Sequence, residues 1–340
     1  MIFSNIEDFK VYVGGAVNKS VELDSLQPAY HEVLQKNIIP LLGQTLWNTV
    51  SDTWNNNPTS ETTALLPFIK RPLSQLTMFE YAKIGNIQFS ESGMMRVETD
   101  QMKSAYKYQE KQYQDWMRTA GYNSLEELQL FLMENKANYA DWPASESFRL
   151  MINTARTFRS YFGKQVNRYI FEILRPIIEE VEIFVIEPSI GTAQYDILKT
   201  AIAEANADDD QLILLHKLYR ALAHFTIEEA MHRQFVKFDG DQVVKMEGLE
   251  PQTYTKTSNA SGKEVEFARR YHQFRAAQHL KRALTFLQDN LDTYPEYKAF
   301  YEAQQAAESE DNQISVRPDY PNPPADSNDS DQGGLILLGA

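Results

Sequence analysis

One segment of the chain carries the residue types that hold metal ions in helical enzymes. It reads His224-Phe-Thr-Ile-Glu228-Glu229-Ala-Met-His232. The spacing Glu229-x-x-His232 places two ligands on one helix face, as in di-iron carboxylate bundles. Such a site needs a second Glu-x-x-His and two more carboxylates, but the nearest counterpart is Glu80-x-x-Lys83, whose lysine would repel a metal. We therefore expect no metal site and no cofactor.

Other residue types that could support catalysis also lack the required pattern. The chain has no phosphate-binding loop, no Gly-x-Ser-x-Gly and no His-Glu-x-x-His. Glu80 and Glu229 could act as catalytic carboxylates, but pairing with an arginine is the more common role. A group of aromatic residues could stack on bases, but we expect it to pack in a core or between subunits. It comprises Tyr106, Tyr108, Tyr113 and Trp116. We therefore predict that the chain is not an enzyme.

Composition limits the remaining functions. The 340 residues are 43% hydrophobic, which suits two medium-sized cores, and the absence of cysteine excludes disulfides, thiolate metal sites and cysteine nucleophiles. A net charge of −14 disfavours stable binding to nucleic acid. The sequence shows no signal peptide and no apolar run that could span a membrane. One basic group is predicted to be a solvated helix face: Lys263, Arg269, Arg270, Arg275, Lys281 and Arg282.

The sequence repeats itself with an offset of about 149 residues. Phe9, Tyr12 and Gly14 match Phe158, Tyr161 and Gly163. Leu26, Pro28, Pro40 and Gly43 match Leu174, Pro176, Pro188 and Gly191. Phe131, Leu132, Asn135 and Tyr139 match Phe286, Leu287, Asn290 and Tyr294. The last step in the offset follows a polar insertion at 253–262, which a surface loop tolerates. We predict two tandem helical units, 1–146 and 147–302.

Each unit has similar start and stop signals. Pro28 and Pro176 are expected at the first turn of a helix, where proline loses no hydrogen bond. Gly43 and Gly191 are expected at a turn before another helix. In the second unit a long helix is expected after Asp208, Asp209 and Asp210, which suit a helix N-terminus by capping and by the dipole. Its counterpart in the first unit contains two prolines and should start late or kink. These are Pro67 and Pro72.

The second half of each unit is predicted to contain a short β-hairpin and closing helices. Segments 87–97 and 236–246 each alternate around a turn. Ser124 and Glu127 form a Ser-x-x-Glu capping box, which predicts a helix start. The fold class is therefore mainly α, with one small hairpin per unit.

The segment 303–340 differs in composition from the two units. It is rich in acidic residues and proline and should be flexible or extended. It nevertheless ends in four adjacent large aliphatic residues, which we predict bind a partner, with docking onto their own domain as the alternative. They are Leu335, Ile336, Leu337 and Leu338.

These motifs together resemble a known set of proteins. The stretch 141–145 (Asp-Trp-Pro-Ala-Ser) leads into 152–158, followed by the proline and glycine landmarks and the apolar end. The chain resembles uncharacterised proteins of tailed phages and prophages, whose units are similar to phage head–tail connector (adaptor) proteins. The resemblance implies a structural ring protein of the virion head–tail junction, assembled in the host cytoplasm.

The same resemblance implies the partners. They are other copies of the chain in a ring that matches the portal symmetry, the portal protein, and tail or neck proteins, while DNA only passes through the lumen. The alternatives are another neck or tail-completion ring protein, or a helical metal-binding enzyme built on His224, Glu228, Glu229 and His232.

Overall fold

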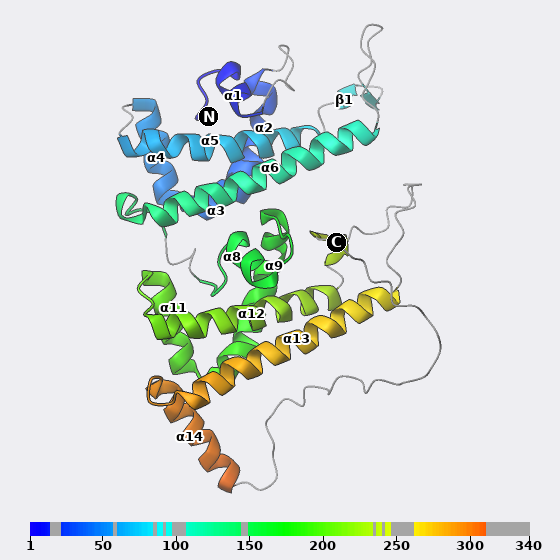
Figure 1. Cartoon of the computed structure of the whole chain (residues 1–340). Coiled ribbons are helices and arrows are strands. Elements are labelled where there is room, and N and C mark those ends of the chain that lie inside the picture. The colour runs from blue at the N-terminus through cyan, green and yellow to red at the C-terminus, as the bar shows by residue number, and fades with distance from the viewer. Residues whose placement is uncertain are drawn as a thin grey trace, which may run out of the picture.

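The computed structural model describes the chain at 1–13, 22–56, 60–83, 87–90, 93–96, 107–143, 149–233, 236–239, 242–245 and 262–310. These residues are mainly helical, as predicted, and the helices recur in the same order in two units (Figure 1). Among the described helices, none combines the length and the apolar character needed to cross a bilayer.

The first unit contains α1 Ile6–Val13, α2 Leu23–Val33, the π-helix η2 Leu34–Ile38, α3 Ile39–Leu42, α4 Gln44–Asn56, α5 Ser60–Tyr81, β1 Ile87–Ser90, β2 Gly93–Arg96, α6 Lys107–Glu134 and the 3-10 helix η3 Lys136–Asn138. The second unit contains α8 Ala155–Phe162, α9 Arg168–Val181, the π-helix η4 Glu182–Ile186, α10 Glu187–Ile190, α11 Thr192–Glu204, α12 Asp209–His232, β3 Val236–Asp239, β4 Gln242–Lys245, α13 Gly262–Asp289 and α14 Pro295–Glu310. Both strand pairs are antiparallel, with Ile87 opposite Arg96 and Val236 opposite Lys245.

Each unit has its own hydrophobic core. One cluster draws its buried residues from 2–142 and the other from 150–297. In both units the two long helices pack side by side, α5 on α6 and α12 on α13 (Figure 1). The tyrosines near the end of each unit make equivalent hydrogen bonds. The Tyr139 hydroxyl donates to the carbonyl of Glu61 at 3.1 Å, and the Tyr294 hydroxyl donates to the carbonyl of Asp210 at 2.8 Å. The tandem duplication is thus confirmed. The predicted boundary between 146 and 147 lies outside the described residues.

Two helix-start predictions based on proline are wrong. Pro28 and Pro176 lie inside α2 and α9 rather than at their first turns. In α9 the start is set by Asn167, whose side chain accepts a hydrogen bond from the backbone N–H of Ile170. The apolar face that follows this cap, including Phe171, is buried, and its burial outweighs the hydrogen bond that proline removes.

The predicted helix start at Ser124 is also wrong, because α6 runs through it without a break. Ser124 is buried, and its hydroxyl donates to the side-chain oxygen of Gln75 at 2.8 Å instead of capping a helix. Glu127 forms an ion pair with Arg71 at 2.9 Å. Gly121 allows α6 to approach α5 closely, since a Cβ there would meet the Leu76 side chain at 2.6 Å.

The long helices and the tail bring one confirmation and two corrections. The acidic N-terminus predicted for α12 is confirmed: Asp208 and Gln211 form a reciprocal capping box, while Asp209 and Asp210 lie in the first turn rather than before it. α5 contains both Pro67 and Pro72, so the predicted late start is wrong. The predicted tail from residue 303 is too long, because α14 continues to Glu310; the rest of the tail lies outside the described residues.

The glycine turns are confirmed, and both glycines also leave space for a neighbouring side chain. Gly43 has φ +79° and Gly191 has φ +82°, and each ends a short helix that contains a proline. A Cβ at Gly43 would lie 2.8 Å from Pro143, in the chain that leaves the first unit. A Cβ at Gly191 would lie 2.7 Å from Phe300 of α14. The same hollow is therefore filled by a linker in one unit and by a helix in the other.

These contacts predict the effect of adding a methyl group. Gly191→Ala is expected to destabilise the second unit by roughly 2–4 kcal/mol, because backbone strain and a clash with Phe300 act together. Gly163→Ala is the comparison for an added methyl group without a neighbour: its φ is also +82°, but its ψ is 5° where that of Gly191 is 143°, and nothing lies within 4 Å of the added Cβ. The control should lose only about 1 kcal/mol. Urea unfolding of both variants measures the combined effect of the Gly191 backbone conformation and of Phe300 on stability, and equal losses would contradict the prediction.

Candidate assembly interface

The predicted metal-ligating residues of α12 do not converge. His224 is buried, and its Nδ1 lies 2.9 Å from the Nδ1 of His272 on α13. Glu228 points instead to Arg269, with which it forms an ion pair at 2.8 Å, and His232 is exposed. Across the parts of the chain that the structure describes, no group of three or more His, Asp or Glu side chains is arranged so that it could hold a metal ion.

The recurring carboxylates are held in ion pairs. Glu229 contacts Arg233 at 2.6 Å, and Arg233 also binds Glu180, so the predicted pairing with arginine is confirmed for this residue. Glu80 binds the ammonium of Lys83 at 2.5 Å instead of an arginine. Both carboxylates are therefore engaged in local ion pairs along their own helices.

A buried histidine cluster lies in the second unit, and the sequence reasoning missed it. The rings of His272 and His279 lie 5.2 and 5.5 Å from the ring of His224, in stacked geometry. Burial, followed by nearby positive charge, lowers the pKa of His224 to about 3 and those of His272 and His279 to about 4. The three rings are thus neutral at pH 7.

The repeat contained the signal for this cluster. In the first unit, the positions of His224 and His279 are occupied by Gln75 and Ser124, which are hydrogen-bonded to each other. A polar pair therefore lies between the two long helices in both units. In the second unit the larger side chains of histidines take the places of glutamine and serine. This role is structural, and it explains why His224 lies away from Glu228.

The contact between the two units is the most elaborate polar site among the described residues. α6 of the first unit packs on α8 and α9 of the second. The carboxylate of Glu126 accepts a hydrogen bond from the backbone N–H of Arg156 at 2.5 Å and so caps the N-terminus of α8. Its other oxygen lies 3.9 Å from the guanidinium of Arg159. Glu126 is only 5% exposed, so this contact is buried.

A second pair of residues ties α6 to α9. The side-chain amide of Gln129 donates to the carbonyl of Asn153 at 3.2 Å and accepts from the guanidinium of Arg168. Arg168 is 3% exposed and also binds Glu172 at 2.6 Å. A buried arginine is stable only when its donors are paired, and here they reach across the junction and along α9.

Aromatic rings complete the junction on one side. The rings of Tyr122 on α6 and Tyr169 on α9 have centroids 5.1 Å apart. The guanidinium of Arg118 lies 4.7 Å above the ring of Tyr169, close enough for a cation–π contact. The junction therefore has paired charges, a tilted contact between aromatic rings and buried hydrogen bonds, which are features of a fixed interface.

Another buried carboxylate anchors the chain where it enters the second unit. Glu182 is 1% exposed and accepts hydrogen bonds from the backbone N–H of Met151 at 2.6 Å and the hydroxyl of Tyr195 at 2.9 Å. Lys199 contributes an ion pair at 3.0 Å. Burial raises the pKa of Glu182, while these partners oppose the shift. The segment after the linker is thus fixed to α11.

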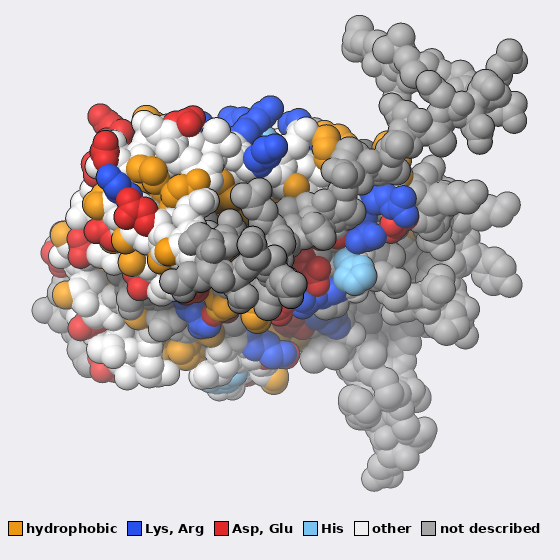
Figure 2. Space-filling view, turned by 90° about the horizontal axis from the view of Figure 1, so that it is seen from below, with side chains coloured by type: hydrophobic (Ala, Val, Ile, Leu, Met, Phe, Trp, Pro, Cys, Tyr) orange, Lys and Arg blue, Asp and Glu red, His pale blue; other side chains and the backbone are white. Residues whose placement is uncertain are grey.

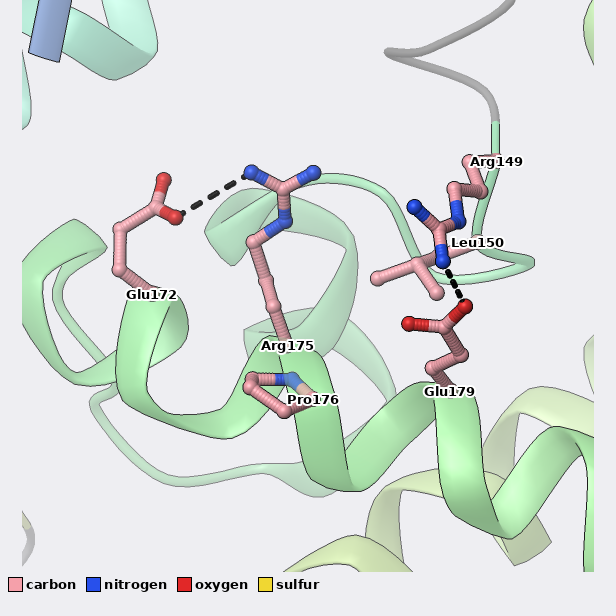
Figure 3. Close-up of a pocket in the computed structure, with 6 residues that line it drawn as sticks. All are labelled: Arg149, Leu150, Glu172, Arg175, Pro176 and Glu179. Atoms are coloured by element: carbon pink, nitrogen blue, oxygen red, sulfur yellow. Dashed lines mark hydrogen bonds and ion pairs between the residues drawn. The ribbon is translucent and has the colours of Figure 1, made fainter. Parts of the chain in front are cut away.

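A hollow of about 290 Å³ lies beside the junction, over α9 (Figure 3). Its charged side chains point toward one another in two ion pairs, Arg175 with Glu172 at 3.3 Å and Arg149 with Glu179. Leu150 and Pro176 complete the lining. Because the charges neutralise each other locally, the hollow offers no concentrated charge that would select a ligand.

The remaining predicted residues are not among those that form the junction as described above. The apolar end 335–338 and Tyr106 fall outside the described residues. Tyr108 and Trp116 are 60% and 55% exposed, so they do not pack in the core. Of the basic residues predicted on a solvated face, Arg270, Lys281 and Arg282 are exposed on α13, as expected, whereas Arg269 and Arg275 are half-buried.

Comparison with known proteins identifies a family. Residues 38–150 and 186–304 match the Family of unknown function (DUF6712), and together these segments cover more than half of the chain. No curated protein and no solved structure matches the chain. The two matched segments correspond to the two structural units. The chain is therefore a member of the Family of unknown function (DUF6712), and it carries the family's unit twice.

Proposed function

We propose that this protein is a structural component of the head–tail junction of a tailed phage, a connector or adaptor ring between the portal and the tail. The proposal starts from the resemblance carried by 141–145, 152–158 and the proline and glycine landmarks. In this role the chain assembles with itself, with the portal protein and with tail or neck proteins in the host cytoplasm.

The observation that carries the proposal is the junction between the units. Its buried residues Glu126, Gln129 and Arg168 bind one another's elements rather than lining an open cleft. Buried and fully paired groups of this kind hold the two units of one chain in a fixed arrangement, which suits a structural role. The acidic composition is consistent with a passage for DNA, because a negatively charged wall lets DNA slide without binding.

The mass of the protein in solution tests the proposal. The purified full chain is measured by light scattering, alone and mixed with a portal protein encoded in the same genome. We expect a ring-sized assembly that forms, or becomes stable, when the portal is present. A chain that stays monomeric and does not bind the portal would contradict the proposal.

The predicted hook at the end of the chain is tested in the same mixture. A variant that lacks 333–340 should bind the portal or tail partner more weakly, since it loses the four aliphatic residues predicted to dock. Unchanged binding would show that 335–338 do not bind this partner, and it would leave the connector proposal as it stands.

A further inference from the structure

The two long helices of each unit contact each other through the same series of side-chain pairs (Figure 1). In the first unit three pairs follow one another along α5 and α6: Phe68 with Phe131, Arg71 with Glu127 and Gln75 with Ser124. The equivalent positions on α12 and α13 are Lys217 with Phe286, Arg220 with Arg282 and His224 with His279. The repeat therefore places one arginine opposite another, and we call Arg220 and Arg282 the arginine pair.

The neighbouring pairs fix the position of the arginine pair in the second unit. On one side the ammonium of Lys217 lies 4.9 Å from the centroid of the Phe286 ring, and on the other side the two histidine rings stack at 5.5 Å. Arg220 and Arg282 lie between these contacts, and both are exposed. Where the first unit has an ion pair across its long helices, the second unit thus has two cations at opposite positions.

No carboxylate of the described residues neutralises the arginine pair. The sequence has no acidic residue at 211–227 of α12 or at 267–288 of α13. Arg220, Arg275 and Arg282 form no ion pair with any part of the chain that the structure describes. All three lie near His279, because burial first and then their charges lower the pKa of its ring to about 4. Like charges placed this close repel one another, so the arrangement favours an anion between them.

The chemistry of the site favours a carboxylate. On the face that Figure 2 shows, Lys and Arg side chains form several groups, while Asp and Glu side chains gather toward one end, so local positive regions exist in this acidic protein. The net charge of −14 disfavours a long polyanion such as nucleic acid, whereas a short acidic segment brings few additional charges. In the first unit the same place is taken by the carboxylate of Glu127, which accepts from the guanidinium of Arg71 at 2.9 Å.

The chain itself carries a segment of the required composition. Residues 326–331 read Asp-Ser-Asn-Asp-Ser-Asp, and no basic residue follows Arg317. The 311–325 segment can span about 50 Å when extended, whereas α14 and the part of α13 after Arg282 together measure about 35 Å. The acidic segment is therefore long enough to return to the arginine pair. Because it is tethered, its effective concentration there is on the order of 1 mM.

We propose that Arg220 and Arg282 form a carboxylate-binding site, and that the acidic segment 326–331 of the same chain occupies it. Guanidinium groups bind carboxylates through charge-assisted hydrogen bonds, and two of them can hold one carboxylate from both sides. Since Leu335 follows Asp331 by only four residues, the contact also holds the start of the predicted partner-binding end beside α13. This inference does not depend on the connector proposal.

Disulfide formation in the full chain tests the contact, because the native sequence has no cysteine. Ser330→Cys places one thiol in the acidic segment, and Thr285→Cys places the other at an exposed position of α13, one turn from Arg282. We expect the two thiols to form a bond within the chain rapidly in a redox buffer. Raising the salt concentration to about 1 M should slow this reaction on the order of ten-fold, because salt screens the charges.

The repeat supplies a variant that removes the site without disturbing the fold. Arg282→Glu introduces the residue of the first unit, so Arg220 gains a carboxylate from α13 and the acidic segment should be released. The rate of disulfide formation should then fall on the order of ten-fold. Replacing the three aspartates of 326–331 by asparagine should have the same effect. Arg71→Gln is the matched control, because it removes the equivalent arginine of the first unit and should leave the rate unchanged.

Three results would overturn the inference. The first is an equal rate in the doubly cysteine-substituted chain and in its Arg282→Glu or asparagine variants. The second is a rate that does not change with salt. The third is a mixture of singly substituted chains that forms linked dimers as fast as the internal bond forms, which would assign the segment to another copy. Portal binding is measured separately, so a chain that ignores the portal but keeps the arginine-dependent bond contradicts the connector proposal alone.

Discussion

At pH 5 the second unit is expected to unfold at a clearly lower temperature than at pH 7, while the first unit changes much less. The cause is the cluster formed by His224, His272 and His279 between α12 and α13. Its rings are buried against Phe162, and four cations oppose their protonation: Lys164, Arg220, Arg275 and Arg282.

The direction follows from proton linkage. An unfolded histidine has a pKa near 6.5, whereas the pKa of His224 in the folded unit is about 3 and that of His272 is about 4. Between pH 6.5 and pH 4 the unfolded chain thus binds more protons than the folded chain. The stabilisation is complete above pH 6.5 and is lost as the pH falls. At pH 5 the loss is about 2 kcal/mol for each of these two histidines.

The repeat supplies the variant that tests this cluster. His224→Gln combined with His272→Met and His279→Ser introduces the residues of the first unit, Gln75, Met117 and Ser124. Calorimetric scans at pH 7 and pH 5 should then show a much smaller shift for the second unit. His232→Gln is the control, because His232 is exposed. If the unfolding temperature of the second unit fell equally between pH 7 and pH 5 in the triple variant, the histidines would be ruled out as the cause.

Arg168→Met is expected to destabilise the junction between the units by about 3 kcal/mol or more. The substitution keeps most of the side-chain volume but leaves the side-chain oxygen of Gln129 without its donor in a buried site. It also removes the ion pair with Glu172 and the contact of the guanidinium with the Phe171 ring. Urea unfolding should then show the transitions of the two units further apart than in the native chain, because the units lose their coupling.

Arg175→Met is the matched control for this experiment. Arg175 lies on the same helix and binds the same carboxylate, Glu172, at 3.3 Å, but its side chain is 40% exposed. A pair in that position contributes less than about 1 kcal/mol. Equal losses for the two variants would mean that the buried position of Arg168 has no special importance.

Sequence reasoning succeeded where the signal was local or repeated. Asp208, Asp209 and Asp210 were recognised as a helix N-terminus because short acidic side chains before an apolar stripe favour capping and the helix dipole. Gly43 and Gly191 were recognised as turns because they recur at the same place in both units. Matches of this kind predicted the tandem architecture without any knowledge of the packing.

The same reasoning failed where burial decided the outcome. Ser124 and Glu127 have the pattern of a capping box, yet the leucines that follow them are buried and keep α6 continuous. The histidine cluster joins residues that are 48 and 55 positions apart on two helices, so no local pattern indicates it. The junction likewise depends on Glu126 and Arg168, whose pairing appears only once the two units are placed against each other.

The hollow at Gly191 limits how the chain can be extended. In the first unit the corresponding hollow at Gly43 receives Pro143, and the chain then proceeds to the next unit. In the second unit α14 fills the hollow with Phe300, as a terminal cap does in a repeat array. If a third unit were joined by a linker that packs on Gly191 as Pro143 packs on Gly43, that linker would take the place of Phe300 and displace α14. An engineered three-unit chain should therefore replace 295–310 with a copy of the residues after Trp142, whereas a simple fusion after α14 would leave the added unit out of register.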